Sequence, residues 1–310
     1  MVHTCGLVQK IFPPFQKSEN KEERKDLELA SQMKMGKTVH YKKVISASRR
    51  VDLVAFYPEF MVERLEQMGM ENIHTLVIWT KDPENMLAHP ELREALRRLS
   101  QIYVLLTITG LGGTALEPQA PTTEEIFRKL PPIIDFIGSP VRLAIRYDPL
   151  IDVIYQNQAE ISNIDINLFQ EILSRSQSLG IRRVIVSYVT IYPKVERRLK
   201  QNGLRIVDHQ IEEITDFIKN KMMPRTEKLG MELCTCVLPD LTTRGCIDGE
   251  SLIQLHPLRE PCSKAKDKSQ RENCHCTKSI DIGQWFACYH NCLYCYGNPT
   301  QRQGDRFNTE

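Results

Sequence analysis

The chain has 310 residues, of which 41% are hydrophobic and 26% charged, and its net charge is +2. This composition is typical of a globular protein with one large core, and the balanced charge argues against a nucleic-acid-binding protein. No stretch approaches the ~20 apolar residues of a membrane span, and the first residues lack the apolar region of a signal peptide, so we expect a cytoplasmic protein. Nine of the ten cysteines lie at or after residue 234, which in a reducing compartment favours metal binding over disulfides.

Residues 1–42 are predicted to form a polar N-terminal extension. Pro13 and Pro14 interrupt its start, and residues 18–26 form a run of charges of both signs, which is usually solvated. A surface helix over residues 20–34 would be supported by oppositely charged side chains four residues apart. Cys5 stands apart from the other cysteines, and we assign it no role.

From residue 43 onward, short apolar runs alternate with helical patterns. Runs of this kind are typical of buried parallel strands. The predicted strands are Lys43–Ser48, His74–Thr80, Ile102–Thr109, Val141–Tyr147, Arg183–Val189 and Met231–Cys236. The predicted helices are Phe60–Met68, Glu91–Ser100, Thr123–Phe136 with an interruption at Pro131-Pro132, Asn167–Leu179 and His209–Leu229. The alternation predicts an α/β fold over residues 43–236, a partial (β/α)6 TIM-like barrel with parallel strands.

Unusual polar residues follow the predicted strands, at the rim where β/α barrels build their sites. The candidate catalytic residues at this rim are Arg49, Arg50, Asp52, Lys81, Arg146 and Asp148. Simpler alternatives stay open for single residues. Asp52 is placed to cap a helix, and Arg146 to form a structural ion pair with Asp148 or Glu117.

The most informative motif lies near the end of the chain and reads Cys288-Tyr-His-Asn-Cys292-Leu-Tyr-Cys295. Three thiolates at this spacing can wrap one compact metal centre, and thiolate suits iron–sulfur clusters, zinc or copper(I). A closed zinc site takes four protein ligands, whereas three ligands on a cluster leave one iron open. The number of cysteines therefore favours a cluster with an open iron.

This spacing resembles the Cys-x-x-x-Cys-x-aromatic-Cys motif of the radical S-adenosylmethionine (SAM) enzymes, with Tyr294 at the aromatic position. Residues 45–52, 77–83, 146–149 and 279–283 further resemble a bacterial family of unknown function with such cysteines at its C-terminus. The resemblance implies a 4Fe–4S cluster on the three cysteines and SAM on its open iron. One-electron reduction would then cleave SAM and start radical chemistry on a small-molecule substrate, with a flavodoxin or ferredoxin as electron donor.

The resemblance also suggests residues for SAM itself. The candidate cofactor-binding residues are Tyr294, Thr109, Gly112, Gly113 and Glu117. A glycine-rich turn receives the amino group of SAM in those enzymes, but the pair Gly112-Gly113 also fits an ordinary loop turn. Asp148 is a further candidate for the ribose hydroxyls or the SAM ammonium. Arg49, Arg50 and Arg146 suit a carboxylate or phosphate.

Four further cysteines match the number that a second metal site needs. They are Cys236, Cys246, Cys274 and Cys276. We predict an auxiliary 4Fe–4S cluster, with a zinc knot as the alternative. Cys234 shares a strand face with Cys236 and is an alternative ligand, whereas Cys262, His275 and His290 are expected to be non-ligands. Residues 237–310 would form a Cys-rich segment packed at the barrel mouth.

These features predict an iron–sulfur protein, a radical-SAM-like enzyme acting on a small molecule. Two alternatives belong to other classes. One is a zinc or iron–sulfur protein with a structural or electron-transfer role and no catalytic activity. The other is a nucleic-acid enzyme similar to the photoproduct lyases, against which the balanced charge argues.

Overall fold

The computed structural model describes residues 41–155, 159–238, 240–242 and 244–301. The extension predicted over residues 1–42, with Cys5, lies almost entirely outside these described residues. Within the described ranges, no helix is long and apolar enough to cross a membrane.

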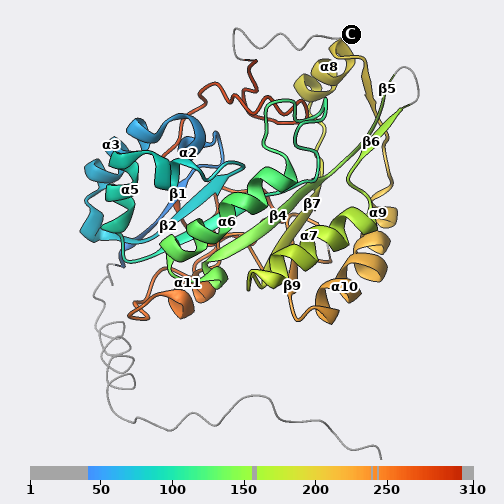
Figure 1. Cartoon of the computed structure of the whole chain (residues 1–310). Helices are drawn as coiled ribbons and strands as arrows, with labels where there is room; N and C mark the ends of the chain where they lie inside the picture. The colour runs from blue at the N-terminus through green and yellow to red at the C-terminus, as the bar shows by residue number, and fades with distance from the viewer. Residues whose placement is uncertain (1–40, 156–158, 239, 243, 302–310) are drawn as a thin grey trace, which may run out of the picture. The chain divides into compact units, whose positions relative to one another are not determined.

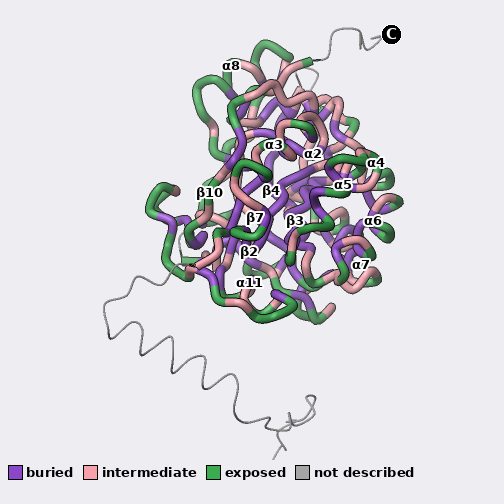
Figure 2. The backbone as a smooth tube through the Cα atoms, turned by 90° about the vertical axis from the view of Figure 1, so that its left-hand side faces the viewer, coloured by how far each residue is buried: buried purple, intermediate pink, exposed green. Residues whose placement is uncertain are grey.

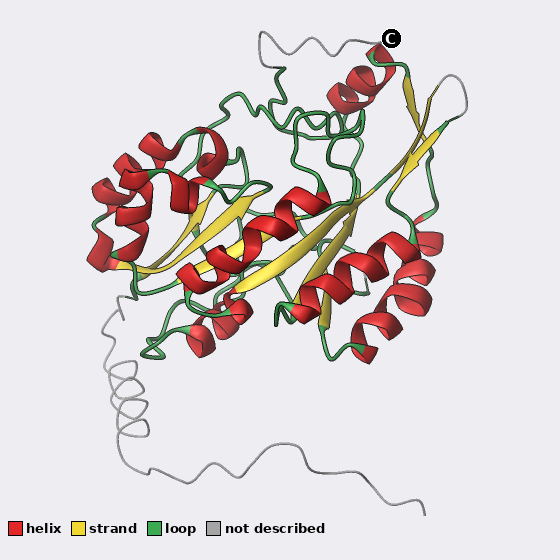
Figure 3. Cartoon of the chain, in the orientation of Figure 1, coloured by secondary structure: helices red, strands yellow, loops and turns green. Residues whose placement is uncertain are grey.

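A seven-stranded parallel sheet forms the centre of the fold, in the order β10-β1-β2-β3-β4-β7-β9 (Figures 1 and 3). Its strands are β1 (Lys43–Ala47), β2 (Ile73–Thr80), β3 (Ile102–Thr107), β4 (Leu143–Leu150), β7 (Arg183–Tyr188), β9 (Glu232–Thr235) and β10 (Ile280–Asp281). Six of them coincide with the predicted strands, which confirms the α/β fold with parallel strands. The short β10, which was not predicted, pairs with β1 in parallel at one edge, and β9 lies at the other.

Both faces of this sheet are covered (Figure 2). Strand β2 is buried at all eight positions and β3 at all six, as expected for parallel strands between two layers. Alternate side chains of β2 enter two different clusters. Leu76 and Ile78 pack with the helices, whereas Val77 and Trp79 pack with the Cys-rich segment, including Cys246. The C-terminal segment therefore fills the face of the sheet that the helices leave open.

The helices that cover the other face are α2 (Leu53–Phe56), α3 (Pro58–Met68), α4 (Asn85–Ala88), α5 (Pro90–Arg97), α6 (Thr123–Ile137), α7 (Ile166–Ser178), α9 (Ile211–Phe217) and α10 (Met223–Lys228). Helix α8 (Pro193–Gln201) packs with the short strands Asp152–Tyr155 and Leu204–Ile206, whereas α11 (Gly249–Leu255) packs with the Cys-rich segment to which it belongs. A π-helical turn, η3 (Ile218–Met222), joins α9 to α10 within the predicted helix His209–Leu229. Figure 1 shows α8 and the red loop that precedes the C-terminus at one end of the sheet and α11 at the other.

The predicted interruption of the third helix at Pro131-Pro132 is wrong, because α6 continues through both prolines. Each proline removes one backbone hydrogen bond and costs roughly 3 kcal/mol inside a helix. Six side chains of α6 are buried in the core, and each contributes roughly 1.5–3 kcal/mol. A capping box between Thr122 and Glu125 also fixes the start of the helix. Tertiary burial thus outweighs the local cost.

Several short elements were not predicted. A small antiparallel sheet combines β5 (Asp152–Tyr155) with β6 (Glu160–Ser162) and β8 (Leu204–Ile206). Three- and four-residue strands are too short to show an alternating pattern, and α8 and α11 lack a long apolar periodicity. Helix α8 nevertheless matters to the site, because it carries Arg198.

Two histidines stack in the core at the start of the sheet. The rings of His74 and His256 lie with centroids 4.6 Å apart, and both side chains are buried. Burial lowers the pKa of each ring. His74 Nε2 is also hydrogen-bonded to the carbonyl oxygen of Glu260 at 2.7 Å.

We predict that the free energy of unfolding falls as the pH is lowered from about 7 to about 5. Both folded-state pKa values lie below the roughly 6.5 of an unfolded chain, so the unfolded state takes up more protons as the pH falls. Urea denaturation at the two pH values measures the effect. A variant with His74→Gln and His256→Gln should lose much of this pH dependence, and an equal dependence in both proteins would contradict the assignment.

Candidate metal centre

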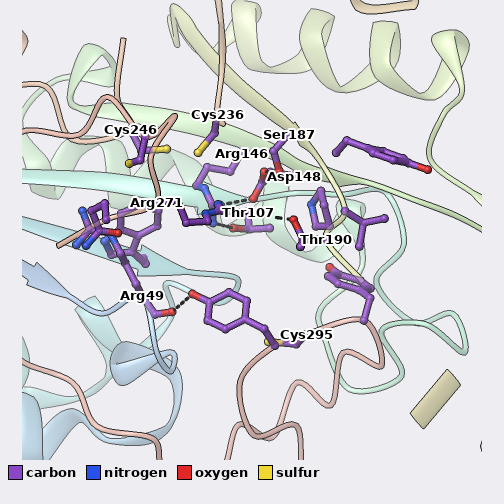
Figure 4. A pocket seen from close by; sticks show the side chains of 18 of the residues that line it. Arg49, Thr107, Arg146, Asp148, Ser187, Thr190, Cys236, Cys246, Arg271 and Cys295 are labelled. Atoms are coloured by element: carbon purple, nitrogen blue, oxygen red, sulfur yellow. Dashed lines mark hydrogen bonds and ion pairs between the residues drawn. The ribbon is translucent and has the colours of Figure 1, made fainter. Parts of the chain in front are cut away.

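A cavity of about 440 Å³ opens at the C-terminal ends of the parallel strands (Figure 4). Strand side chains on its wall include those of Trp79, Thr107, Arg146 and Ser187. Six of the seven predicted metal ligands also line it, namely Cys236, Cys246, Cys274, Cys276, Cys292 and Cys295. Two sets of cysteines that are separate in the sequence therefore face one space.

The second set forms a continuous series of thiols. Side-chain hydrogen bonds join Cys236 to Cys246, Cys246 to Cys276, and Cys276 to Cys274. The hydrogen bonds shared along this series lower the pKa of Cys236 and Cys276 and raise the pKa of Cys246 and Cys274. The backbone N–H of Ile247 also points to Cys276 Sγ at 3.5 Å. Thiols are chemically suited to a soft metal centre, but within the described ranges no three His, Cys, Asp or Glu side chains stand in the arrangement of a formed metal site.

Arg183 explains why Cys236 and not Cys234 faces the cavity. Its Nε donates to Cys234 Sγ at 3.3 Å, on the buried side of β9, and its Nη2 donates to the carbonyl oxygen of Gly245 at 2.8 Å. Arg183 thus holds the Cys234 thiol in a hydrogen bond and anchors the loop that carries Cys246. Of the two alternative ligands, only Cys236 lines the cavity.

Two other residues that were expected to be non-ligands lie away from the cavity wall. Burial raises the pKa of Cys262 to about 11, and its thiol donates to the carbonyl oxygen of Gly249 at 3.6 Å. His275 is exposed and does not line the cavity.

A tight loop brings together the three cysteines of the C-terminal motif. The backbone N–H of Cys295 donates to the carbonyl oxygen of Cys292 at 3.0 Å, and that of Cys288 donates to Asn298 at 2.8 Å. Burial raises the pKa of all three thiols, that of Cys288 to about 12. Negative charge on Cys288 or Cys295 further raises the pKa of Cys292, so the three groups are electrostatic neighbours. The Gly297 N–H points to Cys295 Sγ at 3.2 Å, an interaction typical of sulfur ligands in clusters.

Asp52 holds this loop against the sheet. Its Oδ2 accepts hydrogen bonds from His290 Nε2, Thr80 Oγ1 and the Lys81 backbone N–H, each at 2.8 Å. Its Oδ1 accepts from the backbone N–H of Ala55 at 3.0 Å, so the alternative role of Asp52 as a helix cap is confirmed. Asp52 is buried and does not line the cavity, and the same holds for its partner His290.

Glu117 is a second buried carboxylate beneath the loop. It accepts hydrogen bonds from Lys81 Nζ at 2.8 Å, from Thr109 Oγ1 at 2.7 Å and from the hydroxyl of Tyr294. Burial alone would raise the pKa of Glu117, but the Lys81 ammonium and these hydrogen bonds outweigh it and lower the pKa. The backbone N–H of Leu293 also donates to the carbonyl oxygen of Leu116, the residue before Glu117, at 2.9 Å. The cysteine loop therefore packs on the loop that follows β3.

Most of the predicted cofactor residues belong to this loop after β3. Tyr294 lines the cavity, whereas Thr109, Gly112, Gly113 and Glu117 lie outside its wall. A Cβ atom at Gly112 would lie 2.0 Å from the carbonyl oxygen of Pro121, so close packing requires glycine there. Their role toward a cofactor stays a prediction.

The cavity wall carries more positive than negative side chains. The guanidinium groups of Arg49 and Arg146 lie 5.0 and 4.8 Å from the centre of the Trp79 ring. Lys81 and Arg271 also line the wall, and Asp148 is the one acidic residue of the described lining. Asp148 pairs with Arg146, as one of the simpler alternatives proposed. Arg49 Nη2 and Arg146 Nε are buried without a hydrogen-bond partner.

Arg50 has a positioning role through the segment around β10. Its Nη1 donates to the carbonyl oxygen of Gly283 at 2.7 Å and to Asp281 Oδ1 at 3.2 Å, and it does not line the cavity. Asp281, which was not predicted as a site residue, also accepts from Ser48 Oγ at 2.8 Å and from the Arg49 backbone N–H at 2.9 Å. The sequence signal for this strand was the stretch 279–283, which is among the residues that resemble the bacterial family.

The chain belongs to the family described as "Domain of unknown function (DUF1848)", which matches residues 44–297. Comparison of the sequence with curated proteins finds no match.

Solved structures with a similar arrangement share little sequence with the chain. They include Streptococcus suis SuiB bound to precursor peptide SuiA, with 13% identity and a TM-score of 0.31 over 75% of this chain. N-acetylneuraminate lyase from Fusobacterium nucleatum has 12% identity and a TM-score of 0.25 over 66%. A putative dihydrodipicolinate synthetase from Pseudomonas aeruginosa has 10% identity and a TM-score of 0.24 over 71% of this chain. The chain spans 58%, 48% and 54% of these proteins, and similarity at this level carries no functional argument.

We predict that Asp52→Ala lowers the free energy of unfolding by roughly 3 kcal/mol, because it leaves several buried donors without an acceptor. Asp165→Ala is the matched control, since Asp165 also caps a helix, α7, but is exposed and bonds only the N–H groups of that helix. Its loss should cost about 1 kcal/mol. Urea denaturation compares the two variants, and equal losses would show that Asp52 acts as a cap alone.

Proposed function

We propose that this member of the DUF1848 family is an iron–sulfur enzyme of the radical SAM type, with a 4Fe–4S cluster on Cys288, Cys292 and Cys295. The observation that carries the proposal is the cavity at the strand ends, whose wall includes the four cysteines of the second set, two of the three motif cysteines (Cys292 and Cys295) and a surplus of cations. A volume of about 440 Å³ is within the range of small-molecule sites. The site is thus large enough for a cofactor and part of a substrate.

The electrostatics of the motif support such a cluster. Burial, and in addition negative charge on Cys295 or Cys288, raises the pKa of the Cys292 thiol, so the three thiols influence one another's charge. The cations Lys81 and Arg198 favour the thiolate form of Cys295 and oppose the effect of burial. Arg198 also donates from Nη1 to the carbonyl oxygens of Leu293 and Cys295, at 2.9 and 2.8 Å. The chain therefore supplies both the ligands and the positive charge that an anionic centre needs.

Held by Cys288, Cys292 and Cys295, such a cluster would supply the electron for reductive cleavage of SAM, giving methionine and a radical that would remove hydrogen from a substrate. The contribution of the chain is to position the reactants and to exclude water. In this proposal Asp148 would accept hydrogen bonds from ribose hydroxyls or the SAM ammonium, and Arg49 and Arg146 would bind a carboxylate or phosphate.

We propose a second centre, an auxiliary 4Fe–4S cluster, on Cys236, Cys246, Cys274 and Cys276. Its support is the uninterrupted series of thiols on the cavity wall. In this proposal residues 43–236 form the partial barrel, and residues 237–310 carry both centres to its mouth. A small-molecule substrate and an electron donor such as a flavodoxin or ferredoxin are the partners, in a reducing, cytoplasmic setting.

Metal analysis tests the two centres separately. Protein purified without oxygen should contain about eight iron and eight labile sulfide ions per chain. Replacing Cys274 and Cys276 by Ala should leave about half of each, and replacing Cys292 and Cys295 by Ala should also leave about half. About one zinc per chain, unaffected by the second pair of changes, would show that the second set is a zinc knot.

The enzyme itself is tested by incubating the reconstituted protein with SAM and dithionite without oxygen. We predict that 5′-deoxyadenosine forms and that Cys292→Ala reduces its formation at least about 100-fold, because an incomplete ligand set cannot hold the cluster. Cys262→Ala is the control and should retain activity, since Cys262 lies off the cavity wall. A cluster-loaded protein that forms no 5′-deoxyadenosine would favour the electron-transfer alternative.

A further inference from the structure

Exposed aromatic rings gather at the mouth of the cavity. Trp285 is 53% exposed, Tyr296 44% and Tyr192 38%, and they are the exposed large aromatic residues of the described chain. The Trp285 and Tyr296 ring centroids lie 6.0 Å apart, and those of Tyr192 and Tyr296 lie 6.4 Å apart. Exposed aromatic residues that touch one another form a patch, and such patches mark binding sites.

This patch, Tyr192, Trp285 and Tyr296, continues into the cationic interior. Tyr192 and Tyr296 line the cavity, and the Tyr296 hydroxyl donates to the carbonyl oxygen of Arg49 at 2.6 Å. Further in, the Arg49 guanidinium lies by Trp79 with its buried Nη2 unpartnered. Arg271 lines the same cavity, and Figure 4 shows Arg49 and Arg271 on one side of it.

We propose that the substrate of this site is a nucleoside phosphate or a close analogue, with a planar ring and an anionic group. The ring would stack on the aromatic patch, because every nucleobase offers a π-face to Tyr or Trp. The anionic group would point inward to Arg49 and Arg271, since guanidinium groups bind phosphate with two parallel hydrogen bonds. This inference names the substrate class of the proposed enzyme and rests on that function for the reaction, but not for binding.

The chain contains its own reporter for this site. It has two tryptophans, Trp79 on the cavity wall and Trp285 in the aromatic patch. Intrinsic tryptophan fluorescence therefore reports only on the interior of the cavity, through Trp79, and on its mouth, through Trp285. A Trp79→Phe variant leaves the signal of the mouth, and a Trp285→Phe variant leaves that of the interior.

The test is anaerobic calorimetry on the metal-loaded full chain with three probes: adenosine 5′-monophosphate, adenosine and ribose 5-phosphate. The nucleotide should bind at least about tenfold more tightly than either fragment. Trp285→Ala should weaken the nucleotide and adenosine about tenfold and leave ribose 5-phosphate unchanged, whereas Trp285→Phe, which keeps a ring, should restore binding. Equal binding of the nucleotide and ribose 5-phosphate, or no effect of Trp285→Ala, would overturn the proposal.

Leu258→Ala is the control for general surface effects. Leu258 is 73% exposed and lies near His256, at the opposite end of the sheet, so nucleotide affinity should not change. A loss of nucleotide affinity equal to that in Trp285→Ala would overturn the assignment of ring stacking to the aromatic patch.

A final arm repeats the titration with saturating SAM, which also carries an adenine ring and a carboxylate. Nucleotide binding that survives supports a substrate site, and binding that SAM abolishes would assign the patch to the cofactor and overturn the inference. Formation of 5′-deoxyadenosine without nucleotide binding would sink the substrate class but leave the proposed function standing. Nucleotide binding without formation of 5′-deoxyadenosine would support the substrate class and contradict the proposed function.

Discussion

Two buried carboxylates fix the C-terminal cysteine loop to the ends of the parallel strands. Asp52 bonds His290 of the loop together with Thr80 and Lys81 of the sheet, and Glu117 bonds Tyr294 of the loop together with Lys81 and Thr109. Such acceptors remain in the interior only when their partners satisfy them. The position of the cysteine loop, which brings Cys292 and Cys295 to the cavity, therefore depends on these two networks more than on the cysteines themselves.

A second constraint comes from the open face of the sheet. In a parallel sheet both faces must be covered, and here the helices cover one while the Cys-rich segment covers the other. Arg183 fastens this segment through Gly245, which leaves Cys236 and Cys246 at the cavity. The fold thus needs the segment for its core, and the same contacts bring a second set of thiols opposite the first.

The fold could be predicted largely from the sequence because long buried strands leave a clear apolar pattern. Short elements such as β10 and α8 leave none, and the prolines of α6 misled because local propensity does not include tertiary burial. At the site, four of the six candidate catalytic residues, Arg49, Lys81, Arg146 and Asp148, lie on the cavity wall, and their catalytic role stays a prediction. Spacing alone could not show that Arg50 and Asp52 hold other segments in place, nor that Asp281 bonds Ser48 and Arg49, since these contacts join distant parts of the chain.

The central claim is that Cys288, Cys292 and Cys295 hold a cluster with one iron open to SAM. Electron paramagnetic resonance of the dithionite-reduced protein tests it most directly, because a molecule that binds the open iron changes the spectrum of that cluster. The account predicts a reduced-cluster signal that changes when SAM is added, and a Cys292→Ala variant whose remaining signal does not respond to SAM. A wild-type spectrum that SAM leaves unchanged would contradict it.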